Sequence, residues 1–537
     1  MAMPEAVINI EPPLEKASNP IRFGVKHGTF FPNIVAQAVS FVVSIGITLW
    51  LTPLLIRKLG SDLYGLVPLS LSVVSYMSVL DVAVSTSVSR SLTQAYANSD
   101  AQTAQRILSS ALTLCCLTAA ILVIPAGLAT GFLNWILTIP EGALTDAKRH
   151  FGCVAAAFIL STATTPFAVS AFCRNRFDIS HTITILGNLA RILVIVGLFA
   201  VLTPNLSHVG VGILLAAIVS SICSVVASRR ISPGLRPTFS HANRRTIVDL
   251  LATGWWVSVF QVGSILLLSI DLLVVNRALG AEAGGRYAIV LQWAAVLRSV
   301  SGSLSAVFSP TILALYAKGD MDSLVEYASR GVRFVGYIIS IPIGVLCGFS
   351  TPFLAVWVGP EYSSLSPLLS LLIAPLCVNL AVMPMFAVSL AANKVRLPGV
   401  ITLILGVLNL PLAYSLCAYT ELGMVGVALA GIIVLTLKNA LFTPMYAAHN
   451  IGKPWYTFVK SLAPIIPMTA ILAFAAWSTS HYFTLNSWSR LIGAGAALSA
   501  AYCLLIFTIA LNLHDRQAVA ALLKRSLRGI GLRQFNG

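Results

Sequence analysis

Charged residues are scarce in this chain. Only 10% of its 537 residues are Asp, Glu, Lys or Arg, whereas 57% are hydrophobic, and the mean hydropathy is +0.88. An ordinary soluble domain carries about a quarter charged residues. The composition therefore excludes a soluble domain and predicts a polytopic membrane protein.

Several chemical motifs are also missing. The nine cysteines include no Cys-x-x-Cys pair, which disfavours a zinc site or a disulfide framework. The eight histidines do not cluster, which disfavours a histidine metal site in the membrane. No Gly-x-x-x-x-Gly-Lys-Ser/Thr sequence occurs, so no ATP site is expected. We predict no catalytic residue, metal ion or cofactor.

Long apolar runs are what the sequence does contain. A helix needs about 20 apolar residues to cross the hydrocarbon layer, and this length predicts about fourteen transmembrane helices. The expected fold is an all-α polytopic membrane protein with two pseudo-symmetric six-helix bundles and two additional C-terminal helices. The expected segments are a cytoplasmic N-terminal tail (1–31), an N-terminal six-helix bundle (32–228), a basic cytoplasmic linker (229–246), a C-terminal six-helix bundle (247–448), two additional transmembrane helices (449–512) and a basic amphipathic cytoplasmic tail (513–537).

Lys and Arg are distributed unevenly between the predicted loops. With the N-terminus inside, 24 of the 34 basic residues fall in cytoplasmic segments and seven in external ones. This bias predicts that both termini are cytoplasmic, and the basic C-terminal tail is expected to lie on anionic membrane lipids. Topology thus explains the net charge of +16, and no nucleic-acid partner is expected.

A nine-residue motif occurs twice, each time between two long apolar runs. Two glycines in each copy let the backbone end one helix and begin the next nearby. We interpret the repeat as the mark of a duplicated bundle. The copies, 220 residues apart without a gap, are Arg57-x-Leu59-Gly60-Ser61-Asp62-x-x-Gly65 and Arg277-x-Leu279-Gly280-Ala281-Glu282-x-x-Gly285.

Five ionisable residues fall inside predicted spans. Arg191 and Arg298 lie near the middle of the fifth and eighth spans, Asp81 and Lys438 toward the inner third of the second and twelfth, and Asp271 toward the outer third of the seventh. Each costs about 2.5–3.5 kcal/mol at mid-helix. Such residues are expected to face a partner or a cavity.

Two interpretations of these charges stay open. They could form structural ion pairs, such as Asp271 with Arg298 on adjacent helices. Alternatively, three cations against two anions leave an excess positive charge that an anionic guest would offset, and phosphate suits the Arg guanidinium best. On the second interpretation Arg191, Arg298, Lys438 and, at the inner end of the second span, Arg90 are candidate substrate-binding residues.

The motifs resemble those of a known family. The Wzx-like polysaccharide-transport flippases of the multidrug/oligosaccharidyl-lipid/polysaccharide (MOP) exporter superfamily share this span count and these short loops. The matching residues are Arg57-x-Leu59-Gly60, Tyr64-Gly65, Leu80-Asp81 and Ser87-x-x-Arg90 in the first half, and Asp271, Arg277-x-Leu279-Gly280 and Tyr287-Ala288 in the second.

The resemblance implies a transporter and not an enzyme. Two bundles would surround a central cavity and move an undecaprenyl-diphosphate-linked oligosaccharide from the inner to the outer leaflet of the bacterial inner membrane by alternating access. Asp81 or Asp271 could bind H⁺ or Na⁺ as the coupling ion. The implied partners are the lipid-linked glycan, membrane lipids and polysaccharide polymerase or export proteins.

Two other functions stay in view. A cation-coupled drug antiporter of the same superfamily would favour acidic residues in its cavity, and the excess of membrane cations argues against it. A membrane glycan polymerase or ligase would need a large external loop with catalytic residues. The predicted loops are all short.

Overall fold

The computed structural model of the chain describes residues 30–98, 100–174 and 176–510. These residues form helices and contain no β-strand. Thirteen helices are long and apolar enough to cross a membrane, and one bent pair makes a fourteenth if it counts as a single span. The predicted all-α polytopic fold is therefore confirmed. The amphipathic helix expected at 513–537, and the expected N-terminal tail up to residue 29, lie outside the described residues.

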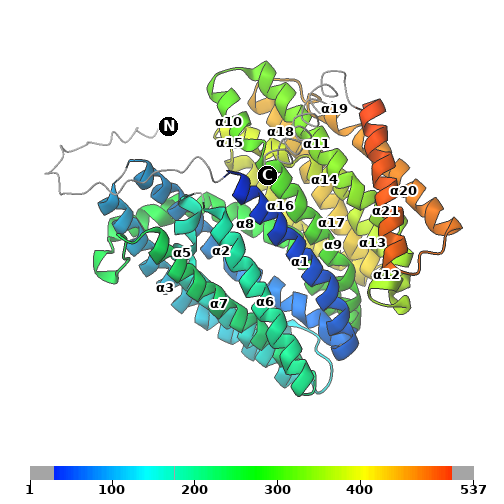
Figure 1. Ribbon diagram of the computed structural model, residues 1–537, viewed down its shortest axis with the longest axis horizontal. Coiled ribbons are helices and arrows are strands. Elements are labelled where there is room, and N and C mark those ends of the chain that lie inside the picture. Colours follow the sequence, from blue (N-terminus) through cyan, green and yellow to red (C-terminus); the bar gives the residue numbers. More distant parts are fainter. Residues whose placement is uncertain (1–29, 99, 175, 511–537) are drawn as a thin grey trace, which may run out of the picture.

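The first bundle is built from six long helices, which Figure 1 shows on one side of the molecule. Each follows a long apolar run of the sequence, and a short helix occupies the loop after the third. The helices are α1 (Phe30–Leu59), α2 (Ser61–Ala97), α3 (Ala101–Gly131), α4 (Leu133–Ile136), α5 (Leu144–Cys173), α6 (Phe177–Val201) and α7 (Leu206–Ile231).

The second bundle occupies the other side of Figure 1, and the last two spans cover its far face. Its helices are α8 (Arg244–Leu279), α9 (Ala281–Ala306), α10 (Ser309–Ala317), α11 (Met321–Gly348), α12 (Ser350–Trp357), the elements of a broken tenth span, α16 (Arg396–Ala418), α17 (Met424–Thr436) and α18 (Thr443–Asn450). The additional spans are α19 (Val459–Leu462), α20 (Ile465–Tyr482) and α21 (Trp488–Leu505), with a π-helical end, η5 (Ile506–Ala510).

The tenth span is broken by proline. Pro375 and Pro384 stand at its interruptions, and a proline has no N–H with which to continue a helix. The two halves of the span meet at 40°. The pieces are η2 (Pro360–Leu365), α13 (Ser366–Ile373), α14 (Leu376–Ala381), η3 (Met383–Met385) and α15 (Phe386–Ala391).

The two copies of the repeated motif make the same turn. Gly60 has φ 87° and ψ 162°, and Gly280 has φ 93° and ψ 177°. Side chains on L-residues disfavour these angles, which explains the glycine in both copies. Each turn joins two antiparallel helices, α1 to α2 and α8 to α9. We call the end of the molecule that holds both turns the motif end, and the opposite end the linker end.

The two bundles touch closely at the motif end. The last glycines of the two motif copies, Gly65 and Gly285, lie against each other. A Cβ on Gly65 would fall 2.6 Å from the Cα of Gly285, and a Cβ on Gly285 would fall 1.8 Å from the carbonyl oxygen of Ser61. Neither position has room for a side chain in this state.

Hydrogen bonds reinforce this contact between the bundles. Thr52 Oγ1 donates to Gln292 Oε1 at 3.2 Å, and Trp357 Nε1 donates to the Leu49 carbonyl at 2.8 Å. Nearby, the side chain of Asn276 on α8 bonds both backbone groups of Thr138 after α4, at 3.0 and 3.1 Å. The motif end is therefore closed.

The linker is also fixed to the first bundle. Gln105 Oε1 accepts a hydrogen bond from the Arg236 backbone N–H at 2.9 Å, and Ser110 Oγ accepts one from the Asn243 N–H at 3.0 Å. Leu235 and the first part of α8, at Leu250, belong to a buried cluster with α2 and α3. The linker between the two bundles is therefore packed against the first bundle.

Contacts between the bundles break the pseudo-symmetry of the repeat. The motif spacing makes α1 equivalent to α8 and α2 to α9. One cross-pair, α2 with α8, packs along its length. The equivalent cross-pair, α9 with α1, has a cleft between its helices toward the linker end. The molecule is therefore closed at one end and open on one flank.

We predict that Gly285→Ala prevents closure of the motif end, because its Cβ would overlap the Ser61 carbonyl. In a background without the nine native cysteines, a cysteine at the buried position Thr52 should then react with a thiol reagent severalfold faster in detergent. Gly302→Ala on the same helix is the matched control, since a Cβ there meets no atom within 4 Å. An unchanged labelling rate in folded Gly285→Ala protein would contradict this account of closure.

Candidate functional site

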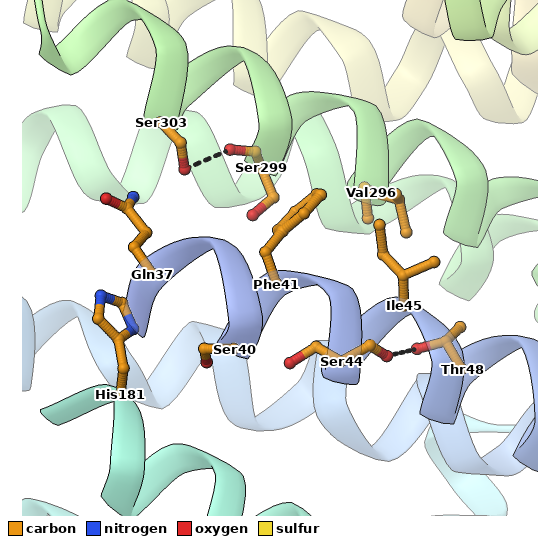
Figure 2. Close-up of a pocket in the computed structure, with 11 residues that line it drawn as sticks. Gln37, Ser40, Phe41, Ser44, Ile45, Thr48, His181, Val296, Ser299 and Ser303 are labelled. Carbon is orange, nitrogen blue, oxygen red and sulfur yellow. Dashed lines mark hydrogen bonds between the residues drawn. The ribbon is translucent and has the colours of Figure 1, made fainter. Parts of the chain in front are cut away.

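A cleft of about 380 Å³ lies between the two bundles on the linker side of the closed end. Figure 2 shows side chains from α1 and α6 on one wall and from α9 on the other. Six of the lining residues carry uncharged polar side chains and His181 adds an imidazole, while most of the exposed wall surface is apolar. The described lining consists of Gln37, Ser40, Phe41, Ser44, Ile45, Thr48, His181, Ala295, Val296, Ser299 and Ser303.

Helical spacing brings these side chains to one surface. On α1, Gln37, Ser40, Ser44 and Thr48 follow one another at intervals of three or four residues, which places them on one face of a helix. On α9, Ala295, Ser299 and Ser303 follow at intervals of four residues, with Val296 beside them. A polar stripe in an otherwise apolar span indicates a surface that faces water or a ligand and not lipid.

Two of the cleft hydroxyls donate hydrogen bonds within their own helices. Thr48 Oγ1 donates to the Ser44 carbonyl at 3.0 Å, and Ser303 Oγ donates to the Ser299 carbonyl at 3.1 Å; Figure 2 draws both bonds. Ser44 Oγ in turn accepts a hydrogen bond from Asn188 Nδ2 at 3.5 Å. The oxygens of Thr48 and Ser303 are thus left to act as acceptors.

The structure places the four predicted cations outside the described lining of this cleft. Arg90 is exposed near the linker end of α2. Arg191 lies on α6, and its Nε is buried without a hydrogen-bond partner in the described part of the chain. The structure therefore does not bring these four cations together in the cleft, and their role in substrate binding stays a prediction.

Lys438 is buried in the second bundle. Its side chain has 7% exposure and lies in a π-helical turn, η4 (Leu437–Phe442). The Nζ is 5.4 Å from the ring centre of Phe260 and 5.5 Å from that of Phe386, so two aromatic faces stabilise the ammonium group. π-Helical turns often mark functional positions in helices.

Asp271 and Arg298 line a second, smaller cavity inside the C-terminal bundle, with a volume of about 40 Å³. Asp271 is buried, and its Oδ1 accepts a hydrogen bond from Asn409 Nδ2 at 3.2 Å. Arg298 is close enough to attract the carboxylate electrostatically. Among the described residues, these two side chains do not reach ion-pair distance. The ion pair between Asp271 and Arg298 that the sequence allowed is therefore not formed, and the two charges only share a cavity.

Three asparagines lie at or near this cavity, and the sequence interpretation did not include them: Asn379 lines it, Asn409 bonds Asp271, and Asn439 bonds Asn379. Asn379 Nδ2 donates to Thr436 Oγ1 at 3.2 Å, and Asn439 Nδ2 donates to the Asn379 carbonyl at 3.1 Å. The side-chain oxygens of Asn379, Asn409 and Asn439 are buried and unpaired. Buried amide oxygens without donors are the kind of ligand that a small hard cation prefers.

Asp81 lies in the other bundle, far along the chain from Asp271. Its Oδ1 accepts a hydrogen bond from Thr165 Oγ1 on α5 at 2.8 Å, and its side chain is half-buried. In the described part of the chain it has no cationic partner. No group of three His, Cys, Asp or Glu side chains there is arranged to hold a metal ion.

The sequence does contain a signal for the cleft, and this signal is separate from the charged residues. The α1 stripe of Gln37, Ser40, Ser44 and Thr48 is visible in the sequence as a helical period of polar residues. The asparagines had no comparable signal, because a single amide in an apolar run is common and its partners come from distant spans.

Comparisons with known proteins agree on a family. Residues 31–315 match the model of the "Polysaccharide biosynthesis protein" family. The "Uncharacterized membrane protein EpsK" of Bacillus subtilis (strain 168) is 32% identical over 507 residues, which cover 94% of this chain and 100% of that protein.

Solved structures share the fold at low sequence identity. "Lipid II flippase MurJ, inward closed conformation" superposes with a TM-score of 0.62 at 15% identity, covering 89% of this chain and 99% of that one. An inward-facing multidrug resistance MATE family transporter of the MOP superfamily gives a TM-score of 0.58 at 15% identity, covering 78% of this chain and 98% of that one.

We predict that Asp271→Asn lowers the free energy of unfolding by about 1–3 kcal/mol, because the half-buried Arg298 charge in the same cavity loses the carboxylate that offsets it. Asp81→Asn should cost less than about 0.5 kcal/mol, since Asn keeps the acceptor for Thr165 and no cation is stranded. Thermal unfolding of the purified variants measures both changes.

The double variant Asp271→Asn/Arg298→Gln provides the control. Removing both charges should recover part of the lost stability. If the double variant is no more stable than Asp271→Asn alone, the electrostatic coupling of these two residues is not what stabilises the cavity.

Proposed function

The chain belongs to the polysaccharide biosynthesis protein family, and we propose that it is a flippase for an undecaprenyl-diphosphate-linked oligosaccharide, which it carries from the inner to the outer leaflet of a bacterial inner membrane by alternating access. The observation that carries the proposal is the polar cleft, open toward the linker end and closed at the motif end. A protein with one open and one closed end suits one half of a transport cycle.

The physical task is to move a hydrophilic glycan and a diphosphate past hydrocarbon while the lipid tail stays in the bilayer. A polar cleft removes the cost of desolvating the headgroup. The cleft lies between α1 and α9, while the equivalent pair, α2 and α8, is packed. An opening on one flank lets the tail remain in lipid while the headgroup enters.

The orientation follows from charge. The linker end carries most of the Lys and Arg residues of the described loops, so we place it, with both termini, in the cytoplasm. The cleft is then open to the side on which lipid-linked precursors are assembled. The lipid II flippase MurJ shares this fold and lends support to a lipid-linked substrate.

We assign the diphosphate to the cations within the spans, of which Lys438 is buried and Arg191 is half-buried. Arg191 and Lys438 have no carboxylate partner among the described residues, and a buried unpaired cation is costly without an anion. Arg298 could contribute when the bundles move, and exposed Arg90 is placed to meet a diphosphate that approaches from the linker end. These contacts would form at different stages of the cycle.

Ion coupling is assigned to one of the two membrane aspartates. Asp271, with the unpaired oxygens of Asn379 and Asn409 beside it, offers ligands for Na⁺ or a site for H⁺. Asp81 offers a carboxylate with one hydroxyl neighbour. The coordinating oxygens favour Asp271 for Na⁺.

The rival functions receive less support. A cationic drug would require acidic groups, and the described lining of the cleft contains no Asp or Glu. A polymerase or ligase would require a catalytic constellation, and the long helices here are joined by short connections. Membrane lipids, and a polysaccharide polymerase or export protein, are the partners that fit a flippase.

We predict that Arg191→Ala and Lys438→Ala each reduce export of the lipid-linked glycan roughly tenfold, the scale of one lost hydrogen bond to a charged group. Arg191→Lys should be milder, because the charge stays while bidentate phosphate contacts are lost. Surface display of the glycan at matched protein levels measures export.

Lys318→Ala, at an exposed position in the loop before α11, is the matched control and should export normally. Normal display from the Arg191→Ala/Arg298→Ala/Lys438→Ala triple variant would remove the cations within the spans from the transport path.

A further inference from the structure

We propose that the cleft between α1, α6 and α9 binds uncharged sugar residues of the glycan, and that the diphosphate is bound outside it. This inference rests on the proposed function and divides the substrate between two kinds of site. Its basis is the chemistry of the cleft wall. None of the four predicted substrate-binding cations belongs to the described lining of the cleft.

The cleft offers no permanent cation that would select a phosphate, and its one imidazole, that of His181, can donate to a neutral hydroxyl as well as to an anion. Its described lining contains no Lys, Arg, Asp or Glu. Phosphate binds best to fixed cations and to several convergent N–H or O–H donors. Thr48 and Ser303 have committed their protons to carbonyl groups of their own helices, so their oxygens would repel an anion and not bind it.

The same features suit a sugar. A sugar hydroxyl can donate to the free lone pairs of Thr48 and Ser303 and accept from other hydroxyls or amides in the wall. Gln37 and Ser299 are exposed in the cleft and have both kinds of group between them. A wall of neutral, two-way hydrogen-bonding groups satisfies a polyol without the desolvation cost of burying charge.

An aromatic ring completes the wall. Phe41 projects from α1 toward α9 in Figure 2, with Ser299 facing it. The C–H face of a sugar ring is apolar and packs on such a ring, while its hydroxyls point to the polar neighbours. The volume, about 380 Å³, is near the lower limit for sites that hold small molecules and so suits part of an oligosaccharide.

The test uses the full chain, purified in detergent, and three probes. The first is the lipid-linked oligosaccharide from the producing cells, the second is the same oligosaccharide freed of lipid and phosphate by mild acid, and the third is inorganic pyrophosphate. Binding is measured by calorimetry. We expect the free oligosaccharide to compete with the lipid-linked form and to bind together with pyrophosphate without competition.

Variants at exposed cleft positions identify the site. Gln37→Ala/Ser299→Ala should weaken binding of the free oligosaccharide at least fivefold and leave pyrophosphate binding unchanged, whereas Arg191→Ala should do the reverse. Ser499→Ala is the matched control, because this hydroxyl on α21 bonds only its own helix, at Gly495, far from the cleft.

Each outcome decides a different claim. If the lipid-linked form binds but the free oligosaccharide does not, or if the cleft variant weakens only pyrophosphate, the division proposed here is wrong and the flippase proposal stands. If the wild-type chain does not bind the lipid-linked form at all, the proposed function itself fails, and this inference with it.

Discussion

Two glycines near the starts of α2 and α9 bring the two bundles into backbone contact, and the closed end of the molecule depends on this contact. Gly65 and Gly285 approach so nearly that neither could carry a side chain. Because these are equivalent positions of one repeated motif, a single local sequence provides both faces of the closure. Closing one end by backbone contact leaves the other end free to open, and the polar cleft lies there.

The bilayer imposes the second constraint, because buried charge must be offset or used. The two bundles accommodate their charged residues differently. In the C-terminal bundle Asp271 and Arg298 share a cavity with amide groups, and aromatic rings surround Lys438. In the N-terminal bundle Arg191 has a buried nitrogen without a partner. The cleft between them is neutral, so charge is kept within the bundles and the shared surface is left to hydroxyl and amide groups.

Much of this could be predicted from the sequence. Apolar length predicted the spans, and the repeated glycines predicted two equivalent turns, which Gly60 and Gly280 make with nearly the same angles. The cleft was not predicted, because it depends on which face of α1 meets which face of α9, and that is decided by packing over the whole bundle. The stripe at Gln37, Ser44 and Thr48 was visible, but uncharged hydroxyls in an apolar run also bond their own helix, as Thr48 does. Spacing alone therefore does not distinguish a helix face that binds a ligand from one whose hydroxyls bond the carbonyl groups of their own helix.

The central claim, translocation of a lipid-linked glycan, is tested most directly in sealed vesicles that contain the purified chain and lipid-linked oligosaccharide in both leaflets. A glycosidase that cannot cross the membrane digests only the glycan on the outside. The account predicts that the protected glycan becomes accessible in vesicles with the protein and stays protected in protein-free vesicles of the same lipid. Glycan that remains equally protected in both, with the protein folded and present in every vesicle, would contradict it.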